Sequence, residues 1–146
     1  MRQILCVVDF TESAGSVLEV AALITKACGA RLIVLFPYRL IINGFQGDIP
    51  SLKSKLETEA KEKFAQLKKN FLHDVSCEFV SEIGFTADRI EAHAKGKHIS
   101  MVVIGQQQTI ATNDIKTFNL QKLIANSRLP FLIVPAEVSV EANSEA

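Results

Sequence analysis

The sequence predicts a single α/β domain in which a five-stranded parallel sheet lies between two layers of helices. Short apolar runs alternate with longer segments whose apolar residues recur every three or four positions, which is typical of strands alternating with amphipathic helices. The predicted strands are apolar throughout, as expected for strands that are covered on both faces. The length of 146 residues and the hydrophobic fraction of 48% suit one folded domain.

The first half of the chain carries two predicted strands with a helix between them. The first strand is Ile4–Val8, an apolar run that stops at Asp9. The helix that follows is expected to end at Gly29, because glycine readily adopts the left-handed conformation of a helix C-terminus. The second strand is Arg31–Phe36, and Pro37 is expected to end it. The apolar face of the helix includes Val17, Ala21, Ile24 and Cys28.

The middle of the chain predicts a long loop and a long amphipathic helix. Residues 38–50 mix apolar residues with Gly, Asn and Pro, so we expect a loop that lies over one end of the sheet. Ser51 is the expected N-terminal cap of the helix. Lys and Glu fill its polar side, which predicts a solvent-exposed face. Its apolar stripe consists of Leu52, Leu56, Ala60, Phe64, Leu67 and Phe71.

The second half repeats the alternation of strand and helix. The third strand lies near Val75–Ser81, and a helix from Thr86 to Gly96 follows it. The fourth strand is Ile99–Ile104, which Gly105 ends.

The remaining segments complete the predicted domain. Residues 106–114 are expected to form a polar loop, and a helix near residues 117–127 is expected to bury Leu120, Leu123 and Ile124. The fifth strand is Phe131–Val134. We assign residues 1–136 to the domain. Residues 137–146 carry three Glu and neither Lys nor Arg, and we expect an acidic, disordered tail.

The composition argues against several classes of function. A formal net charge of zero disfavours bulk binding to nucleic acid or to a membrane surface. The apolar runs are too short for a signal peptide or a transmembrane helix, so we expect a cytoplasmic protein. The three histidines are expected to be exposed or half-buried, and the cysteines Cys6 and Cys28 are expected in the core. Their spacing fits neither a metal site nor a nucleophile–base pair, so we expect no metal and no enzymatic activity.

The carboxyl ends of the strands are the predicted site, because ligands of such sheets bind beyond them. These ends carry Asp9 and Phe10 after the first strand, Pro37 after the second and Gly105 after the fourth. Two interpretations of Asp9 stay open: a ligand for a ribose hydroxyl or a metal, or a carboxylate that binds amides of its own loop. Residues 106–114 are interpreted as a solvent-exposed loop, with a polar binding surface as the alternative.

Three segments of the chain resemble the universal stress protein family. Residues 4–9 with the next helix, and then residues 29–35 (GARLIVL), look like the first half of its domain. Residues 99–105 (ISMVVIG) resemble its fourth strand and terminal glycine, and residues 126–135 (NSRLPFLIVP) are similar to its last turn and strand. The resemblance spans roughly residues 3–135 and implies a three-layer, flavodoxin-like or Rossmann-like fold and a homodimer. It also implies two kinds of member: some bind ATP, and others act in stress response or signalling without it.

The phosphate-binding pattern of the ATP-binding members is incomplete here. Those members carry an Asp after the first strand and, from the end of the fourth, GxxGx(9)G followed by Ser or Thr. This sequence keeps Asp9 and Gly105. The second glycine position is Gln108, the third is Phe118, and the Ser/Thr position is Asn119.

These departures predict that ATP binding by the usual route of the family is lost or weak. Glycines in such a loop let backbone N–H groups approach a phosphate, and the ring of Phe118 would block that approach. Asp114 adds a negative charge to the same loop, and Phe10 replaces a residue that is usually small in the family. Pro37, where family members contact adenine through main-chain groups, has no N–H to donate. We therefore expect no cofactor.

The sequence suggests three functions to different degrees. The preferred one is a non-catalytic, homodimeric stress-response or signalling module that has lost the ATP-binding glycine motif and acts through protein partners or another ligand. The alternative is a nucleotide-binding (ATP or AMP) member with a rearranged phosphate loop. A flavodoxin or a phospho-receiver is disfavoured, because the loop after the first strand lacks a flavin-phosphate pattern and Pro135 stands where a receiver needs Lys.

The last strand is the predicted dimer interface. An apolar strand at the edge of a sheet exposes unpaired backbone groups and needs a cover. In the family that this chain resembles, the last strands of two subunits pair around a two-fold axis. The residues concerned are Phe131, Leu132, Ile133 and Val134.

Overall fold

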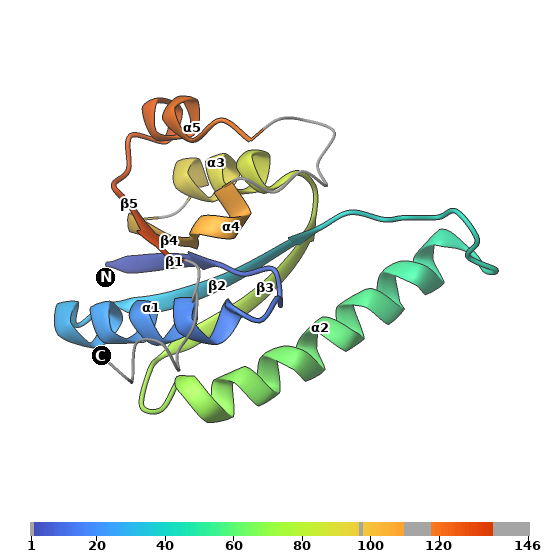
Figure 1. Ribbon diagram of the computed structural model, residues 1–146, viewed down its shortest axis with the longest axis horizontal. Helices are drawn as coiled ribbons and strands as arrows, with labels where there is room; N and C mark the ends of the chain where they lie inside the picture. Colours follow the sequence, from blue (N-terminus) through green and yellow to red (C-terminus); the bar gives the residue numbers. More distant parts are fainter. Residues whose placement is uncertain (1, 97, 110–117, 136–146) are drawn as a thin grey trace, which may run out of the picture.

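A computed structural model describes residues 2–96, 98–109 and 118–135. Its centre is a sheet of five parallel strands in the order β3-β2-β1-β4-β5. Helices cover both faces, so the molecule has the three layers that the sequence predicts (Figure 1). The strands are β1 (Gln3–Val7), β2 (Arg31–Tyr38), β3 (Cys77–Ile83), β4 (Ile99–Gly105) and β5 (Phe131–Val134).

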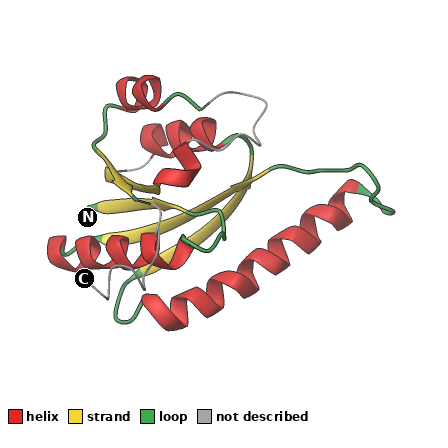
Figure 2. Ribbon diagram, viewed as in Figure 1, coloured by secondary structure: helices red, strands yellow, loops and turns green. Residues whose placement is uncertain are grey.

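The helices divide between the two faces of the sheet (Figure 2). Helices α1 and α2 lie on one face, and α3, α4 and α5 lie on the other (Figure 1). This division follows from right-handed crossovers, because the chain moves one way from β1 to β3 and returns past β1 to β4 and β5. The helices are α1 (Ala14–Cys28), α2 (Ile49–Phe71), α3 (Thr86–Gly96), α4 (Gln106–Thr109) and α5 (Leu120–Ser127).

Two core layers follow from the alternation of side chains along the strands. Cys6 and Val34 belong to the layer under α1 and α2, which also contains Phe64. Leu5 and Leu35 belong to the layer under α3 and α5. Both faces of the central strands are therefore buried, which explains why these strands are apolar throughout.

Helix α1 ends as predicted, but one of its predicted core residues is exposed. Gly29 adopts the left-handed conformation at φ 62°, and its N–H bonds back to the helix. Val17 and Ala21 are buried, whereas Cys28 is exposed at the last turn. The prediction for Cys28 was wrong because the buried face of α1 ends at Thr25, whose hydroxyl donates to the carbonyl of Ala21 at 2.7 Å.

Strand β2 runs through Pro37 instead of ending before it. The last bond between β1 and β2 joins the N–H of Val8 to the carbonyl of Leu35, at 2.9 Å. Along a parallel strand, every second residue bonds to the same neighbouring strand, so Leu35 and Pro37 both face the side of β1. Because β1 has already ended beside Pro37, the N–H that proline lacks would have no strand partner there. On the other side, Tyr38 still accepts from Gly84 of the chain after β3, at 2.9 Å. A proline is tolerated here because the strand has become an edge.

The segment after β2 extends away from the sheet instead of lying over it (Figure 1). It leads to the N-terminus of α2, which runs back toward the body of the molecule (Figure 1). The cap of α2 is Asp48 and not Ser51: the Asp48 carboxylate accepts from the backbone N–H of Ser51 at 2.7 Å. This hydrogen bond holds the pKa of Asp48 below its usual range.

Two predictions for the C-terminal third need correction. Gln106–Thr109 forms a short helical turn where the sequence predicted a loop throughout. In α5, Leu123 is buried, but Ile124 is 38% exposed and does not face the core. Asp114 and the tail over residues 137–146 lie outside the described residues. Within the described part of the chain, no helix is long and apolar enough to cross a membrane.

Candidate functional site

The strand order places a switch point between β1 and β4. From β1 the chain proceeds to β2 and β3 on one side, and it later continues to β4 and β5 on the other. The loops after the two strands diverge at such a point and leave the crevice in which ligands of this fold bind. Val7 of β1 pairs with Ile104 of β4, so Asp9 and Gly105 follow neighbouring strands at one edge of the sheet. The structure therefore brings these two predicted site residues together.

The carboxylate of Asp9 is bound by its own loop. Its Oδ1 atom accepts from the backbone N–H of Thr11 at 3.1 Å and from the Thr11 hydroxyl at 2.7 Å. The same hydroxyl lies 3.1 Å from that of Ser13, at the start of α1. This arrangement matches the second interpretation of Asp9, a carboxylate that satisfies amides of its loop.

Phe10 turns away from the crevice. Its φ of 59° is left-handed, a conformation that costs a non-glycine residue about 1–2 kcal/mol. The ring packs edge-on against Phe36, with centroids 4.8 Å apart, and lies 6.0 Å from the ring of Phe79. Both partners belong to the layer under α1 and α2, so Phe10 is a packing residue of that face.

Gln108 folds back onto Gly105. Its side chain is 8% exposed, and its Oε1 atom accepts from the N–H of Gly105 at a long 3.4 Å. A Cβ at Gly105 would lie 3.1 Å from a methyl group of Val17, so glycine lets the end of β4 pack closely on α1. The backbone donor at the end of β4 therefore already has a partner within the chain.

Phe118 and Asn119 also have roles inside the protein. The Phe118 ring is half-buried against the core layer under α3 and α5. Asn119 caps α5, because its Oδ1 atom accepts from the N–H of Lys122 at 3.0 Å. Pro37 alternates with Phe36 along β2 and so faces the layer under α3 and α5.

The sequence analysis missed a polar cluster that joins α3 to β3. His93 is 5% exposed, which contradicts the expected exposed or half-buried position, and its Nε2 atom lies 2.9 Å from Oε1 of Glu82. Arg89 Nε lies 3.2 Å from the same oxygen. Arg89 and His93 are four residues apart, so they lie on one face of α3. This spacing is the feature of the sequence that could have indicated the cluster. Among the described residues, no three His, Cys, Asp or Glu side chains gather as a metal site.

A second missed contact joins β2 to α2. Tyr38 is buried, and its hydroxyl donates to Oε2 of Glu57 at 2.6 Å. Burial first, and then this hydrogen bond and the Glu57 charge, raise the pKa of Tyr38 above its usual value. Burial likewise raises the pKa of the Cys6 thiol, which keeps that side chain protonated and unreactive.

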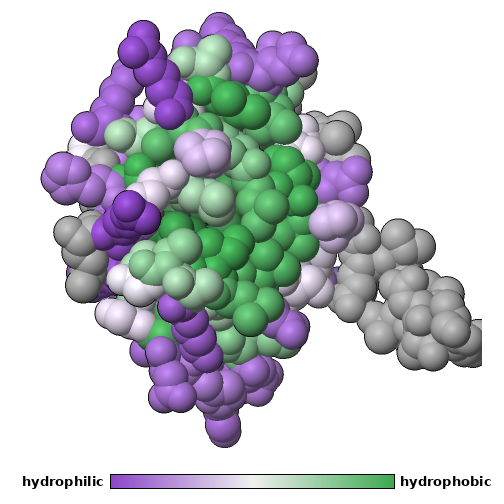
Figure 3. Space-filling view, turned by 90° about the vertical axis from the view of Figure 1, so that its left-hand side faces the viewer, coloured by the Kyte–Doolittle hydropathy of each residue, from purple (hydrophilic) through white to green (hydrophobic). Residues whose placement is uncertain are grey.

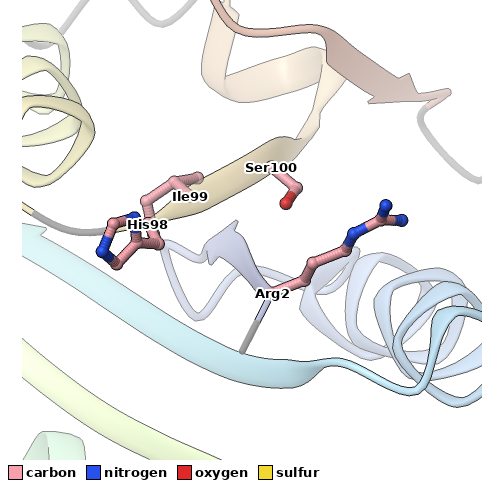
Figure 4. Close-up of a pocket in the computed structure, with 4 residues that line it drawn as sticks. All are labelled: Arg2, His98, Ile99 and Ser100. Carbon is pink, nitrogen blue, oxygen red and sulfur yellow. The ribbon is translucent and has the colours of Figure 1, made fainter.

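An open hollow lies at the amino ends of the strands, away from the switch point. It has a volume of about 500 Å³ and is lined by Arg2, His98, Ile99 and Ser100 (Figure 4). The three polar residues are exposed, and Figure 4 shows that the side chains of Arg2 and His98 extend in different directions. They do not converge on a common ligand position.

The edge of the sheet at β5 is apolar. Within the described residues β5 pairs with β4 alone. Phe131, Leu132 and Ile133 are half-buried, and Val134 is buried. The side of the molecule that carries β5, on the left in Figure 1, presents a broad hydrophobic surface (Figure 3). Leu23 on α1 is 66% exposed, which is high for a large apolar side chain.

The fold and the switch point define the class: a doubly wound α/β domain with a parallel, flavodoxin-like sheet. The chain belongs to the universal stress protein family, whose family model matches residues 1–135. No curated protein is significantly similar to it in sequence.

Solved structures of universal stress proteins share this fold. The protein from Lactobacillus plantarum has a TM-score of 0.64 at 18% identity, covering 93% of this chain and 97% of its own. The protein from Archaeoglobus fulgidus in complex with dAMP has a TM-score of 0.63 at 18% identity, covering 92% and 97%. A family member from Arabidopsis thaliana with AMP bound has a TM-score of 0.59 at 12% identity, covering 97% and 95%.

Proposed function

We propose that this chain is a non-catalytic universal stress protein that has lost the usual ATP site and serves as a homodimeric stress-response or signalling module. The observation that carries the proposal is the contact between Gln108 and Gly105. The amide oxygen of Gln108 occupies the donor that would otherwise face a phosphate oxygen, and it is buried where it does so.

A second donor is occupied in the same way. The N-terminus of a helix offers free backbone N–H groups to an anion. In α5 the Asn119 side chain takes the N–H of Lys122 at 3.0 Å. Pro37 lacks an N–H at the position where the family resemblance implies a main-chain contact with adenine. The zero net charge supplies no general attraction for a polyanion, so phosphate binding would depend on these local donors.

One observation favours nucleotide binding with a rearranged loop as the second candidate. Asp9 and Gly105 still follow neighbouring strands at the switch point. Two similar solved structures contain dAMP or AMP. In this candidate, Gln108 would have to swing away from Gly105 when a nucleotide binds.

Thermal unfolding with and without millimolar ATP and Mg²⁺ separates the two candidates. We expect no change in the midpoint of the wild-type protein. A ligand at 100 times its Kd stabilises by about 2.7 kcal/mol, so binding would raise the midpoint by several degrees. Such a shift, or adenine nucleotide that co-purifies with the protein, contradicts the proposal.

The double variant Gln108→Gly, Asn119→Ser is the matched gain-of-binding test. Gln108→Gly frees the N–H of Gly105, and Asn119→Ser restores the hydroxyl residue of the family pattern while it still caps α5, so the variant is expected to bind ATP more tightly than the wild type in calorimetry. Equal, measurable binding by both proteins would show that Gln108 does not close the site.

The proposed dimer forms at β5. Pairing of two β5 edges around a two-fold axis would satisfy the unpaired backbone groups and cover the hydrophobic side of the molecule seen in Figure 3.

A further inference from the structure

A tight turn lies in the segment that joins β2 to α2. The backbone N–H of Phe45 donates to the carbonyl of Ile42 at 3.1 Å, which closes a four-residue turn around Asn43 and Gly44. Gly44 has a φ of 81°, which glycine adopts without strain at the third position of such a turn. This segment extends away from the sheet (Figure 1). An inference about the turn therefore does not depend on the proposed loss of ATP binding.

The sequence of this turn combines a carboxamide with an unhindered backbone nitrogen. Asn43 is the only asparagine of the chain that is followed by glycine. The backbone nitrogen after an asparagine can attack Cγ of the asparagine side chain and close a five-membered ring. A side chain on the following residue hinders this approach, and glycine has none. Among the asparagines of this chain, Asn43 therefore meets the least steric resistance to ring closure.

The structure leaves both reacting groups free. Asn43 and Gly44 are exposed, and a Cβ at Gly44 would meet no atom within 4 Å. Within the described parts of the chain, neither the Asn43 carboxamide nor the N–H of Gly44 has a hydrogen-bond partner. Water reaches the turn directly, and no contact has to break before the ring closes.

Two asparagines elsewhere in the structure are restrained. Asn119 accepts from the N–H of Lys122 at 3.0 Å, and Nδ2 of Asn126 donates to Oε1 of Glu91 at 3.1 Å. The residues that follow these two asparagines carry side chains and belong to α5. The regular backbone of a helix holds the following nitrogen away from Cγ. These asparagines are therefore internal controls for Asn43.

We propose that Asn43 is a site of spontaneous deamidation in the folded protein. The nitrogen of Gly44 loses its proton and bonds to Cγ of Asn43, the bond from Cγ to Nδ2 breaks, and ammonia leaves with that proton. One water molecule then opens the succinimide ring. Addition of water at Cγ gives an aspartyl residue, and addition at the main-chain carbonyl gives an isoaspartyl residue. Water is the only co-reactant, and nothing is oxidised or reduced.

Either product places a negative charge beside two exposed isoleucines. Ile41 is 77% exposed and Ile42 is 54% exposed, so the turn is an apolar part of the surface. The formal net charge of the chain, which is zero, becomes negative by one charge. The modification changes the surface of the extended segment and leaves the core intact, because the charge replaces a side chain without contacts in the described structure.

Peptide mapping by mass spectrometry tests the proposal. The folded protein is incubated in heavy-oxygen water at mildly alkaline pH, where loss of the amide proton speeds ring closure, and is then digested in ordinary water. Trypsin cuts after Arg39 and Lys53, and the peptide between them contains Asn43 as its only asparagine. We expect this peptide to acquire heavy oxygen and to separate into aspartyl and isoaspartyl forms. The peptides that contain Asn119 and Asn126 should keep their amides.

Three outcomes of this experiment would contradict the proposal. The first is an unchanged Asn43 in the folded protein under conditions that convert a synthetic peptide of residues 40–53. The second is conversion of Asn119 or Asn126 as fast as that of Asn43. The third is an aspartyl product without the isoaspartyl form, which would show direct hydrolysis in place of ring closure.

Two variants separate the chemistry from the fold. Asn43→Gln would need a larger, six-membered ring, so it is expected to lose both products. Asn43→Asp carries the charge from the start and is expected to melt at the same temperature as the wild type, because Asn43 makes no contact in the described structure. Heavy oxygen in residues 40–53 of Asn43→Gln at the wild-type rate, or a lower melting midpoint of Asn43→Asp in circular dichroism, overturns the proposal.

Discussion

Several polar side chains near the carboxyl ends of the strands and at the start of α5 bond to backbone groups of their own segments. Gln108 bonds to Gly105, Asn119 bonds to the first turn of α5, and Asp9 bonds to Thr11. Each contact is local, within three residues along the chain. A local contact needs little ordering entropy, so it competes well with a diffusing ligand. The identities of these residues were read from the sequence by their resemblance to a family pattern. Of their hydrogen bonds, only the binding of Asp9 to amides of its own loop was among the interpretations of the sequence.

Replacing the buried tyrosine makes a testable change in the pH dependence of stability. The pKa of Tyr38 is raised in the folded state, whereas in the unfolded chain tyrosine loses its proton near pH ~10. Above that pH the unfolded state binds fewer protons, so the free energy of unfolding falls as pH rises. Tyr38→Phe removes this effect. At neutral pH the variant also loses the hydrogen bond to Glu57, and we expect it to be less stable by about 1 kcal/mol.

Urea unfolding of both proteins at neutral pH and above pH ~10 measures this effect. The wild type should lose more stability than Tyr38→Phe over this interval. Other groups that titrate in this range are common to both proteins, so they cancel in the difference. Parallel loss of stability would show that Tyr38 ionises equally easily in the folded and unfolded states.

At the scale of elements, α1 and α2 are held together by a close approach. A Cβ at Gly15 of α1 would lie 2.7 Å from Cζ of Phe71, the last residue of α2. A change from glycine to alanine in a helix stabilises the protein by up to about 1 kcal/mol through helix propensity. Overpacking of the new methyl group destabilises it by about 1–3 kcal/mol. Gly15→Ala is therefore expected to lower the stability by about 1 kcal/mol and the melting midpoint by roughly 2–4 °C.

The matched control is Gly96→Ala at the end of α3. A Cβ there would meet no atom within 4 Å, so the variant is expected to be as stable as the wild type or slightly more stable. Circular dichroism melts compare the three proteins. If Gly15→Ala gained as much stability as Gly96→Ala, the contact with Phe71 would be unimportant.

The elements could be predicted from the sequence where local apolar patterns alone decide them. The five strands follow from short, continuous apolar runs and the stripe of α2 follows from an apolar pattern of period 3.6, and the structure confirms them. The errors lie where tertiary context decides. Pro37 continues β2 because β1 has already ended beside it, and Asp48 replaces Ser51 as the cap because the helix begins two residues earlier than Ser51.

At the scale of the whole molecule, the structure brings together only some of the residues that the sequence predicts for the site. Asp9 and Gly105 meet at the switch point, since strand order alone places them there. Phe10 turns to the opposite face of the sheet, because its left-handed backbone directs the ring toward Phe36. The left-handed conformation of a single loop residue leaves no repeating pattern of apolar residues in the sequence, so it could not be predicted from such a pattern.

The hydrophobic side that carries β5 determines how the molecule is expected to assemble. Ile133→Lys places a charge in the proposed pairing of two β5 strands, and we expect a monomer or an aggregate in place of the dimer. Light scattering coupled to size-exclusion chromatography measures the mass. Ile41→Lys is the matched control, because Ile41 is 77% exposed in the segment that extends away from the sheet, and this variant should remain a dimer. A wild-type monomer, or a dimer that persists in Ile133→Lys, would show that β5 is not the interface. In that case the edge of β5 would need another cover, since its backbone donors and acceptors have no partner beyond β4 in the described chain.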